Sequence, residues 1–357
     1  MSSLSGPALL PPLSSKALQI LQRDADAISQ EVTEGYFSLH PECNQGNADL
    51  IHKMCKIDCQ HHLSFLFSAL STATIDIFSD YVHWLKKVML DRKLSLQHSI
   101  DAFTLLKHTI SNRLDNKDLS LAIRMLDEGL KILTSNAPMR SQVDLDAKHV
   151  SIYAADYTQA LIDGNKKQAE TIALQSLTQS LNLIDMEVGI IQPAMIEIGL
   201  LWQQNKLTVA QEHLATAISQ NVLARAFAKA EFSDPIEKKI ICACVEGNHH
   251  GLGLRMISDA YEVSGWDVSF LGTDTPNRSI ISQVDKEKPD ALALSVSMPH
   301  QILGLKELLI QLRADMGGHL PIIILGGRAI NNYQQLAFQL KADNCYLDAK
   351  SVWNDLN

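Results

Sequence analysis

The spacing of hydrophobic and polar residues changes along the chain and divides it into three regions. From about Leu18 to Thr134, apolar residues recur at the three-to-four-residue spacing of amphipathic helices. Within the segment 80–90 this spacing predicts one inward face, made of Tyr81, Trp84, Leu85 and Val88. The stretch 134–140, with Pro138 as its strongest mark, is interpreted as a break. We therefore expect an all-helical N-terminal domain over residues 1–135.

The second region, residues 147–233, carries the same spacing in four shorter segments. The turn around Gly164 ends the first predicted helix, and the second spans roughly 166–180. Asp185 is expected to cap the third helix, which Pro193 is expected to kink, and Thr208 is expected to cap the fourth. The residues expected to face inward are Val188, Ile191, Met195, Ile198 and Trp202, followed by Leu214, Ala217, Ile218 and Val222. Four short-linked helices of this length predict a four-helix bundle.

The third region, residues 236–357, alternates short apolar runs with helical segments. Runs near 239–245, 266–271, 291–296, 321–325 and 344–347 predict five strands. Helices are expected near 252–263, 279–286, 299–315 and 332–340. Such alternation requires a parallel sheet with right-handed crossovers. Five strands favour the flavodoxin-like order, in which a ligand binds outside the carboxyl ends of the strands. The predicted fold class is therefore α/β for this region and all-α for the two before it.

Composition and charge narrow the classes of function. Hydrophobic residues make up 46% of the chain and charged residues 20%, as in ordinary globular proteins. The sequence has no membrane-length apolar run, and its first 18 residues resemble a tail more than a signal peptide. A net charge of -9 disfavours a large nucleic-acid surface, so we expect no direct DNA binding. The cysteines form no disulfide or zinc pattern, and Cys242 and Cys244 are interpreted as small core residues of a cytoplasmic protein.

Three loops at predicted strand ends carry the candidate chemistry. The loop after the first strand presents His250, with Gly253 three positions later to permit close approach of a ligand. Imidazole is a good ligand for a borderline metal such as cobalt. Asn248 can hydrogen-bond the far ring nitrogen of such a ligand and thereby set its tautomer. His249 is the competing ligand, but its spacing to a glycine does not fit.

The other two loops follow the third and fourth strands. They contain the small hydroxyl residues Ser295 and Ser297 and the glycine pair Gly326 and Gly327, which leaves room for a flat ligand. Each loop alone is a weak indicator, since a histidine or a Gly-Gly after a strand is more often an ordinary loop residue or turn. Their occurrence at three strand ends together indicates a cofactor site.

These motifs resemble those of the cobalamin-binding domain shared by methionine synthase, corrinoid proteins and base-off mutases. That family has Asp-x-His-x-x-Gly after strand one, a Ser-x-Leu or Ser-x-Thr motif after strand three and Gly-Gly after strand four. The resemblance implies that His250 is the lower axial ligand to cobalt. It also implies that the nucleotide tail of the cofactor passes the Ser and Gly positions. The motif departs at Asn248, where the family prefers Asp, and this should make His250 a weaker donor to cobalt.

The preceding helices resemble the cap of cobalamin-dependent photoreceptors. Trp202 is followed, after nine residues, by Glu212 and His213. In that family this signature lies over the upper cobalt face, where the adenosyl group sits, and the resemblance gives the same roles to these three residues. The alternative is that Trp202 is a bundle core residue and Glu212 and His213 a solvated face. Gln203 stands where the light-sensing repressors have a histidine, so a bis-histidine light state is not expected.

The N-terminal region is vaguely similar to helical, globin-like sensor domains of bacterial photoreceptors and stress regulators. Its chemical interest lies in the run 55–66, which contains His61 and His62, with Tyr81 and Trp84 following. Some cobalamin photoreceptors with such a domain are thought also to bind a bilin, so biliverdin is one hypothesis for this region. The alternative is an interaction domain without a cofactor.

The resemblance, which covers about residues 147–357, implies a light-responsive signalling protein that binds adenosylcobalamin. Photolysis of the cobalt–carbon bond would rearrange the cap and the N-terminal domain. The alternative is a corrinoid shuttle subunit of a methyltransferase system; a mutase subunit would need a substrate barrel, which the chain lacks. A sensor is favoured over an enzyme. We expect a homo-oligomer that signals to an unidentified protein effector.

Overall fold

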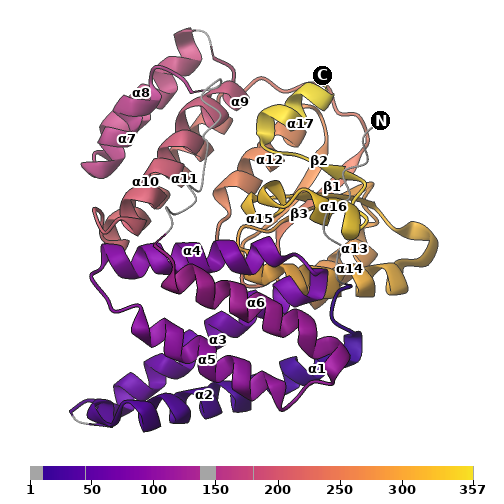
Figure 1. Ribbon diagram of the computed structural model, residues 1–357. Helices are drawn as coiled ribbons and strands as arrows, with labels where there is room; N and C mark the ends of the chain where they lie inside the picture. Colours follow the sequence, from indigo (N-terminus) through magenta and orange to yellow (C-terminus); the bar gives the residue numbers. More distant parts are fainter. Residues whose placement is uncertain (1–10, 45, 137–149, 180, 357) are drawn as a thin grey trace, which may run out of the picture. The chain divides into compact units, whose positions relative to one another are not determined.

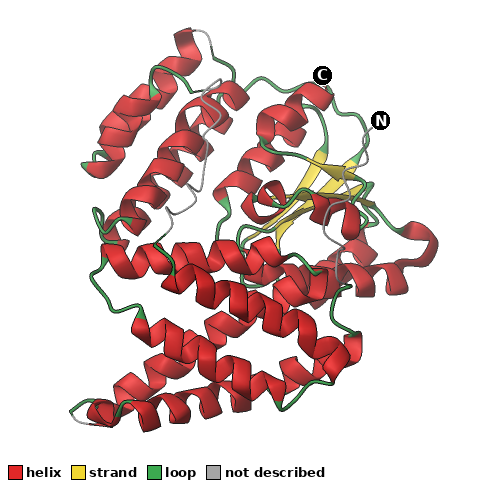
Figure 2. Cartoon of the chain, viewed as in Figure 1, coloured by secondary structure: helices red, strands yellow, loops and turns green. Residues whose placement is uncertain are grey.

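The computed structural model describes residues 11–44, 46–136, 150–179 and 181–356, which belong to two compact units, 1–140 and 141–357. The first unit is all helical, whereas the second combines further helices with the only sheet of the described residues (Figures 1 and 2). The first ten residues of the expected tail and Pro138 of the expected break lie outside the described residues. Within the described residues, none of the helices is long and apolar enough to span a membrane.

In the first unit, the described residues form six α-helices and a short 3-10 helix. They are α1 (Ser15–Arg23), α2 (Ala25–Leu39), η1 (Pro41–Asn44), α3 (Ala48–Thr72), α4 (Ile75–Asp91), α5 (Gln97–Ser111) and α6 (Asn116–Thr134). The end of α6 at Thr134 coincides with the start of the predicted break.

The predicted inward face of α4 is wrong by part of a turn. Of its four residues only Tyr81 is buried, and Trp84, Leu85 and Val88 are half-buried. The residues that α4 buries are Ile77, Phe78, Ser79, Tyr81, Val82, Lys86 and Met89. The reason is that α4 packs against both α3 and α6, and that Lys86 Nζ donates to the Ile132 carbonyl oxygen (2.7 Å) at the end of α6. Carbonyl groups at a helix end have no partner within the helix, so they stabilise a buried lysine there.

The helices of the cap follow in the second unit. They are α7 (Ala154–Ile162), α8 (Lys166–Gln179), α9 (Leu183–Met186), the π-helical turn η3 (Glu187–Ile191), α10 (Gln192–Gln203) and α11 (Val209–Phe227). As predicted, α7 ends at a glycine: Gly164 has φ +66°, and the next N–H, of Asn165, donates to the Ala160 carbonyl oxygen (2.8 Å). Because α9, η3 and α10 run on without a gap, the bundle has the four helical rods that were predicted.

The third rod corrects two details of the prediction. Its N-cap is Asn182, whose side chain accepts the backbone N–H of Asp185 (2.8 Å), so Asp185 is not the cap. Pro193 follows η3 directly and the rod continues through it. A proline removes one N–H and crowds the carbonyl four residues earlier, that of Gly189. A widened π turn accommodates this, and the Gly189 carbonyl oxygen accepts the N–H of Ser151 (2.9 Å).

The fourth rod, α11, begins with the predicted cap. Thr208 accepts the N–H of Gln211, and the Gln211 side chain accepts the N–H of Thr208, which is a capping box. Its buried residues are Ala215, Ile218, Ser219, Val222, Leu223 and Ala226. Leu214 and Ala217, which were expected to face inward, are exposed because the buried stripe is rotated toward Ala215.

The remainder of the second unit is a five-stranded parallel sheet with the predicted order β2-β1-β3-β4-β5. The strands are β1 (Lys239–Cys244), β2 (Asp267–Gly272), β3 (Ala291–Ser295), β4 (Ile322–Gly326) and β5 (Asn344–Cys345). The intervening helices are α12 (Leu252–Val263), α13 (Asn277–Glu287), α14 (Ile302–Met316), α15 (Arg328–Asn332) and α16 (Gln335–Gln339), with α17 (Ala349–Leu356) after β5. The helix predicted over 332–340 corresponds to the shorter α16, and neither α15 nor α17 was predicted.

One face of the sheet and the cap have a common hydrophobic core. Ile240, Cys242 and Cys244 alternate along β1 and point into the same buried cluster as Ile191 and Ile198 of the third rod. Both cysteines are fully buried, which confirms that they are small core residues. The cap packs on α12 and α17, and α12 packs on β1 and β2, so these two helices connect the apolar residues of the cap with those of the sheet in one buried layer.

Candidate functional site

The three predicted loops meet at one edge of the sheet. Cys244, the last residue of β1, pairs with Ser295, the last residue of β3, and Ser295 pairs in turn with Gly326, the last residue of β4. Three adjacent parallel strands therefore end in a single row. The loops that follow them start side by side, at the position where α/β sheets bind ligands.

Asn248 connects the first two loops and is fully buried. Its Nδ2 donates to the Ser295 carbonyl oxygen (2.9 Å), and its Oδ1 accepts the backbone N–H of His250 (3.1 Å). Both polar groups of the amide are thus used by the backbone. The hydrogen bond that was expected from Asn248 to the His250 ring is not present in this structure, because the side chain orients the loop instead.

Two residues that the sequence analysis missed complete this network. Gln301 is buried; its Nε2 donates to the Gly247 carbonyl oxygen (2.8 Å), and its Oε1 accepts the N–H groups of Ser297 and Met298 (3.2 and 3.0 Å). Asp274 Oδ1 accepts the N–H of Gly247 (2.7 Å). Both residues follow strand ends, and this position could have indicated that they belong to the site. Their hydrogen-bond partners lie in other loops, so the sequence did not reveal their role.

The glycines of the predicted site have different surroundings. Gly327 has φ +92°, and a Cβ there would lie 2.5 Å from the Val296 carbonyl oxygen, so only glycine fits between the β3 and β4 loops. A Cβ at Gly253 would meet nothing within 4 Å. The first turn of α12 therefore leaves open space beside the His250 loop, as an incoming ligand would require.

His250 has the properties of an available metal ligand. Its side chain is exposed at the sheet edge, and its ring nitrogens make no hydrogen bond to the described part of the chain. The surrounding protein atoms desolvate the imidazolium and so lower the pKa of His250; Glu212 opposes this, and His249 and Arg328 add to it. A lowered pKa keeps the imidazole neutral near pH 7, the form that binds a metal. This donor fits a cobalt-containing corrinoid.

The cap places Glu212 within electrostatic reach of His250. In the first turn of α11, Glu212 Oε2 lies 2.6 Å from His213 Nδ1, and Glu212 Oε1 accepts the Thr216 hydroxyl (3.0 Å). Both carboxylate oxygens are therefore engaged, and the His213 side chain is 74% exposed. Trp202, near the end of α10, is half-buried against the core of the cap.

The predicted site residues fall into two groups. Those of the sheet loops lie together at the strand ends: Asn248, His250, Gly253, Ser295, Ser297, Gly326 and Gly327. Of the cap residues, Glu212 acts on His250 by its charge. Neither Trp202 nor His213 forms a hydrogen bond or ion pair with those loops within the described residues. Arg328, directly after Gly327, lies near enough to influence His250 and was not predicted.

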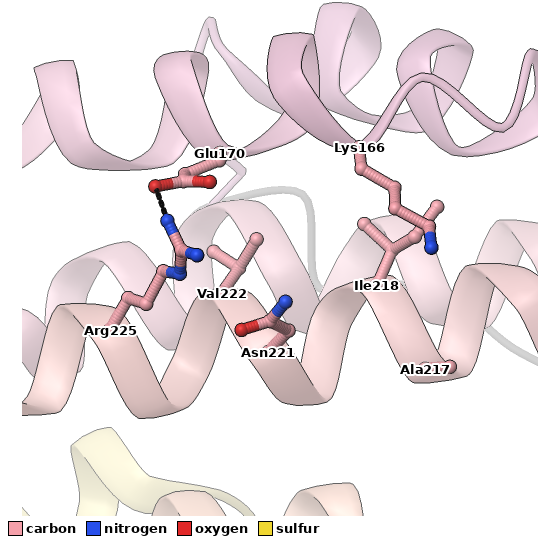
Figure 3. A pocket seen from close by; sticks show the side chains of 7 residues that line it. All are labelled: Lys166, Glu170, Ala217, Ile218, Asn221, Val222 and Arg225. Carbon is pink, nitrogen blue, oxygen red and sulfur yellow. Dashed lines mark hydrogen bonds and ion pairs between the residues drawn. The ribbon is translucent and has the colours of Figure 1, made fainter.

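A separate pocket lies on the cap between α8 and α11 (Figure 3). Its volume of about 70 Å³ has room for about two water molecules. Arg225 and Glu170 form an ion pair across it, and none of the predicted site residues lines it. It is too small for a corrin ring.

In the first unit, the predicted bilin-contacting run is partly core. His62 is buried, its Nδ1 lies 2.5 Å from the Tyr81 hydroxyl, and Tyr81 stacks on Phe65 with ring centroids 3.9 Å apart. Burial lowers the pKa of His62 to about 3, so the ring is neutral. His62 and Tyr81 therefore satisfy each other, whereas His61 is exposed.

Replacing Asn248 with aspartate is expected to lower the free energy of unfolding by about 1–3 kcal/mol, because a carboxylate oxygen would face the Ser295 carbonyl without a donor. Thermal melting of the cofactor-free protein measures this. Asn248→Ala is the matched comparison and should destabilise no more than Asn248→Asp. A stable aspartate variant beside a destabilised alanine variant would mean that the side chain turns to the His250 ring instead.

Comparisons with known proteins cover the second unit. Residues 238–352 match the B12 binding domain family, and residues 153–226 match a second family, also described as B12 binding domain. The HTH-type transcriptional repressor CarA of Myxococcus xanthus is 26% identical over 50% of this chain and 62% of its own length. The repressor CarH of the same organism is 28% identical over 42% of this chain and 50% of its own.

A third relative is the corrinoid protein DSY3155 of Desulfitobacterium hafniense, 23% identical over 47% of this chain and 81% of its own length. The chain thus spans less than two thirds of the length of either repressor. Both B12 binding families match the segments that form the cap and the sheet. The protein therefore carries two B12 binding domains and is a cobalamin-binding protein, related to the CarA and CarH repressors and to corrinoid proteins.

Proposed function

We propose that the protein is a light-responsive signalling protein that binds adenosylcobalamin between the cap and the carboxyl edge of the sheet. The observation that carries this proposal is the arrangement of Glu212 and His250. Glu212 lies in the segment that matches one B12 binding family, and His250 lies in the segment that matches the other. The two residues lie within electrostatic reach of each other. A corrin ring bound by His250 from below would thus have the first turn of α11 above it.

Each candidate residue has a distinct part in this proposal. His250 is the lower ligand, and Asn248 sets the position of its backbone. Ser295, Ser297, Gly326 and Gly327 surround the nucleotide tail, and Gly253 leaves room beside it. Trp202, Glu212 and His213 face the upper ligand, with Glu212 orienting the His213 ring through Nδ1. The cofactor supplies a cobalt–carbon bond that light can break.

The signal follows from packing. Trp202 and the end of α10 would pack against the adenosyl group of a bound cofactor, so the cap would have a second arrangement available without that group. Relatives described as transcriptional repressors support a regulatory role. We further propose that this chain does not bind DNA itself and that it acts on a protein effector as a homo-oligomer. A bilin in the N-terminal domain remains a hypothesis, for which exposed His61 is the candidate contact.

A corrinoid shuttle is the second candidate, because proteins named as corrinoid proteins align over most of their own length, as DSY3155 does. A shuttle transfers a methyl group and needs access to the upper cobalt face from solvent. Trp202, Glu212 and His213 on that face would restrict such access, which is why we favour the sensor.

Green light is expected to change both the absorption spectrum and the shape of the adenosylcobalamin complex. The spectral change reports loss of the adenosyl group, and small-angle scattering or gel filtration reports the rearrangement. Because Gln203 offers no imidazole, the photoproduct should keep water or another weak upper ligand. A spectrum of two nitrogen ligands that disappears in His213→Ala would instead make His213 the upper ligand. Unchanged spectrum and shape would favour the shuttle.

A further inference from the structure

Two carboxyl groups lie buried where the cap contacts the α/β part of the second unit. Glu187 is the first residue of η3, and Asp259 lies on α12; both are completely inaccessible to solvent. The short helix α9, directly before Glu187, packs on α12. The two carboxyl groups, hereafter the carboxyl pair, thus come from opposite sides of this contact.

The hydrogen bonding of the carboxyl pair is incomplete if both groups are ionised. No oxygen of either carboxyl has a hydrogen-bond donor among the described residues, although Arg255 Nε forms an ion pair with Asp259 Oδ1 at 2.7 Å. Two carboxylates and one guanidinium leave one buried negative charge. One added proton makes the group neutral and also supplies the missing donor between the carboxyls, which removes the cost of a buried unpaired charge.

We infer that Glu187 and Asp259 share a proton, and that this protonated carboxyl pair positions the third rod of the cap on α12 in a pH-dependent way. Glu187 donates to the Asp259 carboxylate, and Asp259 is held from its other side by Arg255. Loss of the proton leaves two like charges in contact inside the protein. The contact between the rod and α12 then weakens.

The other charged and titratable groups around the pair are compatible with this assignment. Arg255 lies between the rings of Phe227 and Phe270, with its Cζ 5.1 and 5.7 Å from their centroids, so its position is restricted. Glu262 on α12 adds negative charge near Asp259. Cys242 on β1 also lies near Asp259, but burial raises the pKa of its thiol, which therefore stays neutral. On α17, Lys350 pairs with Asp185 of α9 at 2.6 Å. This ion pair also joins the cap to the α/β part of the unit.

The helix α7 also packs on η3, and its Tyr157 hydroxyl donates to Ser219. Burial raises the pKa of Tyr157 to about 12, so it does not titrate near neutral pH. The carboxyl pair, and not Tyr157, is therefore the fully buried group of this contact that changes its charge near neutral pH.

The direction of the pH effect follows from the carboxyl pair. Burial, and next the charge of Asp259, raise the pKa of Glu187 well above its usual value, and burial raises that of Asp259 to about 6. In the unfolded chain both carboxyls lose their protons near pH 4. Because their pKa values are raised in the folded protein, the contact is most stable below about pH 4. Its stability is lost as the pH rises through the raised pKa values of the pair, of which that of Asp259 is about 6.

The contact matters because of what each helix carries. The third rod runs without a gap from α9 through η3 to Trp202 in α10, and α12 begins directly after the His250 loop. The carboxyl pair therefore sets how Trp202 is placed relative to His250. This consequence rests on the proposed function, whereas the pH-dependent contact itself does not.

Hydrogen–deuterium exchange of the full, cofactor-free chain between pH 5 and pH 9 tests the inference. After correction for the intrinsic pH dependence of exchange, residues 183–203 should exchange about tenfold faster or more at the alkaline end. Glu187→Gln keeps a neutral donor toward Asp259, so it should remove this increase. Glu231→Gln, at an exposed position, is the matched control and should behave like the wild type. Equal profiles for the wild type and Glu187→Gln would overturn the inference.

An infrared measurement keeps the inference testable even if Glu187→Gln folds poorly. The wild type at pH 7 should show the carbonyl band of a protonated carboxylic acid, and its absence would overturn the inference. Because neither measurement uses cobalamin, failure of the carboxyl pair is distinguishable from failure of the proposed function. Uptake of hydroxocobalamin across the same pH range then shows whether the cofactor site follows the contact: uptake should fall as exchange rises, in the wild type but not in Glu187→Gln.

Discussion

Replacement of His250 by alanine is expected to weaken cobalamin binding by about 100-fold or more and to shift the bound spectrum toward a base-off form. Loss of a partner that only supports a metal ligand already costs about 10–100-fold in affinity, and His250 is proposed as the ligand itself. Its ring makes no hydrogen bond within the described residues, so the substitution removes no internal contact of that kind. Equilibrium titration with cobalamin, followed by absorption, measures both effects.

His249→Ala is the matched control for this substitution. His249 is the adjacent exposed histidine of the same loop, and its replacement should leave the spectrum unchanged. Melting temperatures of both variants without cofactor establish that the loop is intact. If His250→Ala binds with the wild-type spectrum and His249→Ala does not, the ligand is His249 and the assignment from the motif is wrong.

Replacement of Trp202 by alanine is expected to spare cobalamin uptake but to abolish the preference for adenosylcobalamin over methylcobalamin. An indole can bury a flat adenine group but has little to contact in a methyl group. Loss of one such contact, at about 1.4 kcal/mol, corresponds to about a tenfold drop in relative affinity. Competition between the two cobalamins in the dark measures the ratio.

Trp84→Ala is the control, because Trp84 is also half-buried but lies on α4 in the other unit. It should leave the ratio of affinities as in the wild type. An unchanged ratio in Trp202→Ala would remove Trp202 from the upper face. Trp202 would then be a packing residue of the bundle, the alternative that its position on α10 also allows.

Local sequence signals located most elements, but not the faces that they bury. The helix predicted over 252–263 begins and ends as α12 does, and all five strands appear in the expected order. By contrast, the buried stripes of α4 and α11 are rotated from the predicted ones. Both helices carry apolar residues on more than one side, so periodicity alone leaves two stripes that are nearly equivalent. The neighbouring helices select between them.

The same distinction applies to the site. The spacing of His250, Ser295 and Gly326 indicated loops at strand ends, and the parallel order of the strands was enough to expect them together. The partners of Asn248 were not predictable, because its amide bonds to a carbonyl 47 residues further along the chain. Gln301 was missed for the same reason, since its acceptor in the first loop lies 54 residues before it.

The alternation of elements and the sheet order followed from the sequence alone, because they depend on local periodicity and on short spacings. Only the tertiary structure decided which helix faces are buried, how Asn248 is used, and that Glu187 meets Asp259. These features depend on residues that are distant in the chain and adjacent in space. A carboxyl on a helix normally predicts a solvated face. Glu187 is instead buried opposite Asp259, because the cap packs on α12, and this burial raises the pKa of Glu187.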